Sequence, residues 1–128
     1  MPAPKHKVVV VVDDEPQIVA VVCDVLEDEH IQAVSCGHGN AALACIYKEQ
    51  PSLVVLDVQM PGIDGIQIFE AMRANPQTAT TPVILFTANS HVVTRRLPNY
   101  QEQNAVLLPK PFDIVTFIDL VQGFLTQP

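Results

Sequence analysis

Near its start the chain carries the run Val8-Val9-Val10-Val11-Val12-Asp13-Asp14. Consecutive β-branched residues of this length are typical of a strand that is buried on both faces, as in a parallel sheet covered by helices. The middle of the chain repeats the design in the run Leu53-Val54-Val55-Leu56-Asp57. Two short apolar runs that each end in acid therefore predict two parallel strands with carboxylates at their carboxyl ends.

Three further runs resemble strands, and helical spacing of apolar residues separates the strands from one another. These runs cover residues 32–36, 83–86 and 106–108, and the first of them is expected near an edge of the sheet. The least regular stretch is 89–103, where Pro98 should kink or end a short fourth helix. With right-handed crossovers, this alternation predicts a doubly wound α/β fold with a five-stranded parallel sheet of order 2-1-3-4-5 and five helices.

Two aspartates are placed to begin helices. Asp14 is a candidate N-cap of the first helix, which has Pro16 in its first turn. Asp113 is expected to cap the last helix, whose apolar face is predicted to comprise Ile114, Phe117, Ile118, Val121 and Leu125.

The composition restricts the class of protein. A length of 128 residues with 48% hydrophobic residues fits one folded domain and argues against disorder. No apolar run reaches the roughly 18 residues of a membrane span, and the first residues lack a signal-peptide core, so we expect a cytoplasmic protein. A formal net charge of -7 disfavours direct binding to nucleic acid or to an anionic membrane.

The cysteines form no recognisable framework. Cys23, Cys36 and Cys45 are odd in number and lack CxxC or metal-ligand spacing. Such a set is typical of buried, reduced thiols, so we expect neither a disulfide nor a zinc site.

The strand ends gather the residues that suggest chemistry, because the carboxyl ends of parallel strands form the crevice in which such sheets bind ligands. Asp13, Asp14 and Asp57 should converge there, together with Thr87 and Lys110 from the last two strands. Since three neighbouring carboxylates repel one another, a hard divalent cation such as Mg²⁺ would relieve the repulsion. One aspartate in such a site is able to attack a phosphoryl group while Lys110 and Thr87 bind its oxygens.

In order and spacing these residues resemble the receiver domain of two-component response regulators, which has a flavodoxin-like fold. The resemblance extends over about residues 7 to 126 and rests on Asp13-Asp14, Asp57, Met60-Pro61-Gly62, Asp64-Gly65, Thr87-Ala88 and Lys110-Pro111-Phe112. We therefore expect a flexible tail over residues 1–6 and a receiver domain over residues 7–128.

The resemblance implies a function for Asp57. This residue would accept a phosphoryl group from a sensor histidine kinase or a histidine phosphotransfer protein, and the chain would act as a conformational switch without a separate substrate. It also implies Mg²⁺ as cofactor, bound by Asp13, Asp14, Asp57 and the backbone carbonyl of Gln59. The downstream target, a covalently linked output domain and homodimerisation are left open.

The resemblance further implies roles near the last strand. Thr87 and Lys110 would bind the phosphoryl group, and the Lys110-Pro111 peptide bond would be cis, a form that proline permits. Receivers usually carry Tyr or Phe three residues before the lysine, and this chain has Leu107 there. We therefore expect output to depend on movement of residues 87–89 or on association through exposed apolar residues of the last helix, rather than on an aromatic rotamer.

Three other classes of protein are alternatives. A haloacid-dehalogenase-like phosphatase also forms an aspartyl phosphate, but it needs an aspartate where this chain has Gln59. A flavodoxin-like cofactor protein needs a hydroxyl-rich phosphate loop after the first strand, where this chain has Asp13-Asp14-Glu15-Pro16. A receiver-like interaction module that is never phosphorylated is the third alternative.

Overall fold

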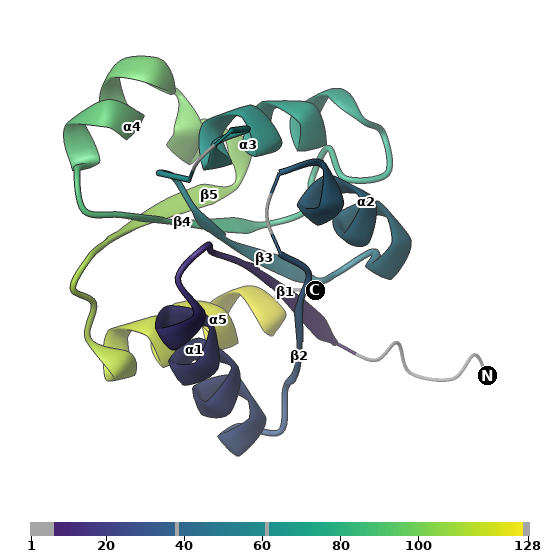
Figure 1. The fold of residues 1–128 in the computed structure, drawn as a ribbon, viewed down its shortest axis with the longest axis vertical. Helices are drawn as coiled ribbons and strands as arrows, with labels where there is room; N and C mark the ends of the chain where they lie inside the picture. The colour runs from purple at the N-terminus through teal and green to yellow at the C-terminus, as the bar shows by residue number, and fades with distance from the viewer. Residues whose placement is uncertain (1–6, 38, 61, 127–128) are drawn as a thin grey trace.

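The computed structural model describes residues 7–37, 39–60 and 62–126. Its sheet has five parallel strands in the order β2-β1-β3-β4-β5, which confirms the predicted topology (Figure 1). The strands are β1 (Val8–Val12), β2 (Gln32–Ser35), β3 (Leu53–Asp57), β4 (Val83–Thr87) and β5 (Ala105–Pro109). The helices within the described residues are α1 (Pro16–Asp28), α2 (Asn40–Glu49), α3 (Gly65–Ala74), α4 (Ser90–Arg96) and α5 (Ile114–Leu125).

Helices cover both faces of the sheet. α1 and α5 lie on one face, and α2, α3 and α4 lie on the other (Figure 1). Because side chains alternate between the faces of a strand, Val9 and Val11 pack with residues of α1 and α5, whereas Val10 and Val12 pack with residues of α2 and α3. Both β3 and β4 are buried at every position. This two-sided burial explains why the strands lack a polar alternation.

The segment between β4 and β5 is irregular, as predicted. α4 spans seven residues and ends at Arg96, and its C-cap Leu97 directly precedes Pro98. A 3₁₀ turn (Tyr100–Gln103) then leads into β5. Proline has no backbone N–H to continue a helix, which explains the early end of α4.

Arg73 connects α3 to this irregular segment. Its Nε donates to the carbonyl of Gln103 at 2.9 Å, and its Nη atoms donate to the carbonyls of Thr78 at 3.0 Å and Thr81 at 2.8 Å. The guanidinium also lies 4.5 Å from the ring centroid of Phe69, and burial lowers the pKa of Arg73. A longer hydrogen bond of 3.5 Å reaches the Asn104 carbonyl, so one side chain holds four loop carbonyls in place.

Two helix predictions need correction. The N-cap of α1 is Glu15 rather than Asp14, because the turn after β1 is one residue longer than predicted. In α5, Asp113 accepts a hydrogen bond from the Thr116 amide at 3.1 Å and caps the helix as predicted. Ile114 is nevertheless 45% exposed. It lies off the row of buried residues that repeats every four positions, namely Phe117, Val121 and Leu125.

The prediction of three buried, reduced cysteines is wrong. A disulfide joins Cys36 and Cys45, and Cys23 stays free. All three side chains are half-buried. Linear spacing does not show that the fold brings the end of β2 against α2, and an odd number of cysteines does not exclude one pair.

None of the described helices has the length and hydropathy needed to cross a membrane.

Candidate functional site

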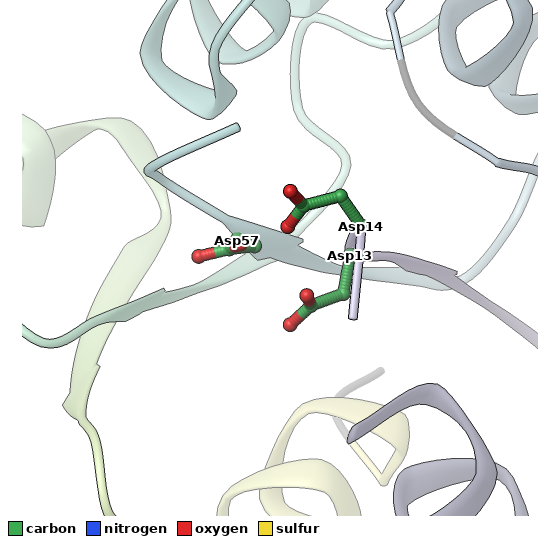
Figure 2. Close-up of side chains that lie close together, drawn as sticks. All are labelled: Asp13, Asp14 and Asp57. Carbon is green, nitrogen blue, oxygen red and sulfur yellow. The ribbon is translucent and has the colours of Figure 1, made fainter. Parts of the chain in front are cut away.

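Three carboxylates meet at the carboxyl edge of the sheet. β1 and β3 are neighbours in a register that pairs Val12 with Leu56, so the next residues, Asp13 and Asp57, come side by side. Together with Asp14 they offer carboxylate oxygens that all lie within 4.8 Å of one another. Figure 2 shows Asp13 and Asp14 after the end of β1 and Asp57 at the end of β3. The predicted convergence of these acids is therefore present in the structure.

Two of these carboxylates are buried and held by the backbone. Asp57 is 2% exposed and Asp13 is 6% exposed, whereas Asp14 is half-buried. Asp13 Oδ1 accepts a hydrogen bond from the Glu15 amide at 2.9 Å, and Asp57 Oδ1 accepts one from the Gln59 amide at 3.3 Å. Gln59 thus contacts Asp57 through its N–H in this structure. Its carbonyl was the group expected to bind a metal.

Lys110 reaches the same cluster from the end of β5. Its Nζ lies 3.3 Å from Asp13 Oδ2, 3.3 Å from Asp57 Oδ1 and 3.6 Å from Glu15 Oε1. Only 16% of this side chain is exposed. The Lys110 amide donates to the Thr87 carbonyl at 2.8 Å, and the Lys110-Pro111 peptide bond is cis as predicted. Backbone and side chain together fix the ammonium over the acids.

The site has a surplus of negative charge. Burial, and then the Asp13 carboxylate, raise the pKa of Asp57 from 3.8 to about 6, although Lys110 acts in the opposite direction. Burial by itself lowers the pKa of Lys110, but the Asp57 and Asp13 carboxylates outweigh it and raise that pKa. Within the described residues, Lys110 is the one ammonium that faces Asp13, Asp57 and Glu15, so a further cation would stabilise the ionised cluster. Its donors are oxygens, which suit a hard ion such as Mg²⁺.

Thr87 is the last residue of β4, which lies beside β3, but its hydroxyl hydrogen-bonds to Asn89 and not to the acidic cluster. The side chain is fully buried. Its Oγ1 accepts a hydrogen bond from the Asn89 amide at 2.9 Å and donates one to the Asn89 carbonyl at 3.0 Å. The structure therefore places Thr87 at the carboxyl edge of the sheet, as predicted, where its hydroxyl stabilises the turn into α4.

Gly65 is a site residue whose importance the sequence did not reveal. In the sequence it contributes only to the Asp64-Gly65 pair of the family resemblance. In the structure its backbone passes against the end of β3, so that a Cβ at this position would lie 2.8 Å from the Asp57 carbonyl carbon and the Val58 Cα, and closer still to the Asp57 carbonyl oxygen. The Gly65 amide also donates to the Val58 carbonyl at 3.0 Å. The close approach requires glycine and fixes the chain just after Asp57.

Two clefts border the acidic cluster. The first, of about 390 Å³, lies between the segment after β3 and α4. Its lining includes Asp64 and Arg96, which form an ion pair of 2.7 Å. The second, of about 400 Å³, is largely apolar and adjoins Lys110. It is lined by Glu15, Ile18, Ala88, Lys110, Pro111 and Phe112. Leu107, at the position usually aromatic in receivers, is partly buried against the core on the α2 and α3 face.

This combination of fold and site defines a known class of protein. The family model of the response regulator receiver domain matches residues 9–122. The chain therefore belongs to the response regulator receiver family, whose members are signalling domains of two-component systems.

Individual relatives have different lengths. The chain is 32% identical over 118 residues to sporulation initiation phosphotransferase F of Bacillus subtilis, covering 91% of this chain and 92% of that protein. It is 32% identical over 117 residues to the DNA-binding transcriptional regulator NtrC of Proteus hauseri, covering 91% of this chain but 24% of that protein. The structure of the chemotaxis response regulator CheY4 of Vibrio cholerae is 26% identical, with a TM-score of 0.81 over 94% of this chain and 99% of that chain.

Proposed function

We propose that this chain is a phosphorylation-switched receiver in which Asp57 accepts a phosphoryl group in a Mg²⁺-dependent reaction. The observation that carries the proposal is the position of Asp57, a buried carboxylate at the strand edge that is shared with Asp13, Asp14 and Lys110. A buried acid surrounded by other acids adds nothing to the stability of a core. Its placement is explained by chemistry at that edge.

The chemical step follows from the contacts of Asp57. Its Oδ1 is engaged by Lys110 and by the Gln59 amide, which leaves Oδ2 as the nucleophile. Oδ2 forms a bond to phosphorus while the bond from phosphorus to the imidazole nitrogen of a phosphohistidine breaks, and the imidazole leaves with the electron pair. The product is an acyl phosphate on Asp57. The chain accepts the group and has no separate substrate, so it is a switch rather than a turnover enzyme.

Three carboxylates are suited to hold Mg²⁺ here, namely Asp13, Asp14 and Asp57, with the Gln59 carbonyl as a further oxygen. When bound, the ion would offset the negative charge of the transferring phosphoryl oxygens. Lys110 supplies a second positive charge from its position between Asp13 and Asp57. Because the Thr87 hydroxyl donates its proton to the Asn89 carbonyl, it must give up this hydrogen bond to donate to a phosphoryl oxygen. We therefore infer that the β4–α4 turn is the element that responds to phosphorylation.

A protein is the proposed phosphoryl donor, either a sensor histidine kinase or a histidine phosphotransfer protein. The apolar cleft beside Lys110 supports this proposal, because Ile18 and Phe112 offer contact area next to the acceptor. A cytoplasmic location belongs to the same proposal. Output targets and any linked output domain also remain proposals, since the chain spans only a quarter of the NtrC relative.

The proposed function is tested by the intact mass of the chain after incubation with acetyl phosphate and MgCl₂. We expect the mass of one added phosphoryl group, lost again in base or hydroxylamine as an acyl phosphate requires. An unchanged mass, or a label that is stable to hydroxylamine, contradicts the proposal.

Removal of one carboxylate from the proposed metal site should abolish Mg²⁺-dependent phosphorylation. We expect Asp14→Ala to lose Mg²⁺-dependent phosphorylation by acetyl phosphate while remaining folded, because Asp14 is only half-buried and lies outside the apolar core. The exposed Asp24 of α1 provides the matched control, and Asp24→Ala should be phosphorylated like the wild type. Equal phosphorylation of both variants in Mg²⁺ would exclude Asp14 from the metal site.

Replacement of the site ammonium should impair both the stability of the acidic cluster and the response to phosphorylation. Lys110→Ala leaves the buried Asp13 and Asp57 carboxylates without their cation, so we expect a less stable chain in buffer without metal. In MgCl₂, where the chain folds, we expect impaired phosphorylation or an impaired structural change after it. The measurement is intact mass together with amide NMR of residues 87–90. Lys48→Ala, at an exposed position of α2, is the control. A Lys110→Ala variant that is phosphorylated and shifts its amide signals like the wild type contradicts this role.

A further inference from the structure

The cysteine pair lies outside the acidic cluster. Cys36 follows the last residue of β2 directly, and Cys45 lies in the middle of α2. The two Cα atoms are 5.9 Å apart, within the range that a disulfide spans without movement of the backbone. Both side chains are half-buried, so neither is sealed from a small thiol reagent.

The fold holds these two residues together without help from the bond between them. Cys45 is flanked in α2 by Ala42 and Ile46, which are fully buried against the sheet and fix the face that the helix presents. Cys36 is fixed by β2, whose residue Ser35 pairs with Val11 of β1. Packing and sheet pairing thus set the separation of the cysteines, and reduction of the bond should leave the two thiols as neighbours.

We propose that Cys36 and Cys45 are a reversible dithiol–disulfide pair, a redox modification site separate from Asp57. Oxidation proceeds by exchange with a low-molecular-weight disulfide such as oxidised glutathione. One cysteine thiolate attacks a sulfur of glutathione disulfide, forms a mixed disulfide and releases one glutathione. The second cysteine thiolate then attacks the mixed disulfide and releases the other glutathione. Oxidised glutathione takes up two electrons and both thiol protons, so that the chain loses two hydrogens.

The cross-link has a local structural consequence. It closes a short loop that contains the turn between β2 and α2, where Gly37 and Gly39 adopt φ angles of 79° and 66°. Carboxyl ends of parallel strands share one edge, so this turn lies at the same edge as Asp13. Closure should slow amide exchange at the start of α2, because it removes the open conformations of the loop.

Cys23 provides an internal control. It lies in α1 and packs with the core on the face of α1 and α5, whereas Cys36 packs with the core on the opposite face. Burial also raises the pKa of the Cys23 thiol, which reduces the fraction of reactive thiolate. An intramolecular bond should therefore form without Cys23.

The test is exposure of the fully reduced chain to glutathione buffers of increasing oxidised fraction, followed by alkylation, intact mass and peptide mapping. We expect loss of two of the three alkylatable thiols, an intact mass equal to that of the reduced chain less two hydrogens plus one alkyl group, and a peptide that joins Cys36 to Cys45. Dithiothreitol should restore all three thiols. Cys23→Ser should still form the bond, and Cys36→Ser should instead hold glutathione on Cys45.

Two results would overturn the proposal. One is a chain that keeps three alkylatable thiols, or carries only mixed disulfides, in the most oxidising buffer. The other is a bond that involves Cys23 or joins two chains. Thiol alkylation and peptide mapping do not involve phosphorylation. Failure of this proposal is therefore distinguishable from failure of the proposed phosphoacceptor role.

Discussion

Asp57→Asn is expected to abolish phosphorylation of the chain and, in buffer without metal, to make the fold more stable. The asparagine amide is a poor nucleophile and forms no acyl phosphate, so the phosphoryl gain should fall to background. The gain in stability has a separate cause. The asparagine side chain carries no charge, so the cost of burying a carboxylate and its repulsion by Asp13 would both disappear while the side chain keeps nearly the same shape.

The stability effect should depend on pH. In the folded chain the pKa of Asp57 is about 6, above the ordinary value of 3.8 that applies to the unfolded chain. The unfolded state therefore loses this proton first, and wild-type stability should fall as the pH rises from about 4 to about 6. Above that interval the full penalty is present, on the order of 3 kcal/mol. Asp57→Asn should be more stable than the wild type by about this amount at pH 7 and equally stable below pH 4.

Urea denaturation at several pH values measures this difference, and intact mass with acetyl phosphate measures the acceptor role. MgCl₂ should stabilise the wild type more than Asp57→Asn, since the variant lacks one carboxylate of the cluster. Asp24→Asn, at an exposed position of α1, is the matched control and should change neither property. A phosphoryl group retained in Asp57→Asn would falsify the assignment of the acceptor.

Most of the fold was predictable because the same alternation of apolar strands and amphipathic helices recurs along the chain. The strands are apolar at consecutive positions, and the order of the sheet follows from the right-handed rule for crossovers. Asp13 and Asp57 were predictable as neighbours because each follows a buried strand and parallel strands share one carboxyl edge. Pro98 marked the early end of α4 for a similarly local reason.

The errors and omissions concern contacts between distant segments. The bond between Cys36 and Cys45 depends on how α2 packs beside the end of β2, which no spacing rule encodes. Arg73 donates to the carbonyl of Gln103, which lies 30 positions further along the chain, although its sequence context is an ordinary helix end. The Asp14 cap was predicted one residue too early, because several polar residues precede Pro16 and each is able to begin a helix.

Gly65 illustrates the same limitation with the largest expected effect on stability. The sequence placed Gly65 in a motif of the family resemblance, but it did not show the contact with the backbone of Asp57. We expect Gly65→Ala to destabilise the chain by about 3 kcal/mol or more, because the new methyl group would overlap the carbonyl of Asp57 and the Cα of Val58. These are backbone atoms in a buried segment, so relief requires movement of β3 or of the start of α3.

Gly123 provides a matched control for the same substitution. It is an exposed residue within α5, and a Cβ at this position would meet nothing within 4 Å. Gly123→Ala should therefore stabilise the chain by about 0.5–1 kcal/mol through the higher helix propensity of alanine. Urea denaturation of both variants measures the contrast. Any Gly65→Ala chain that remains folded should also be phosphorylated more slowly, because displacement of the Asp57 backbone moves its carboxylate away from Lys110. Equal stability of the two variants would show that the backbone of Asp57 and Val58 moves away from the new methyl group at little energetic cost. Gly65 would then not fix the position of the acceptor.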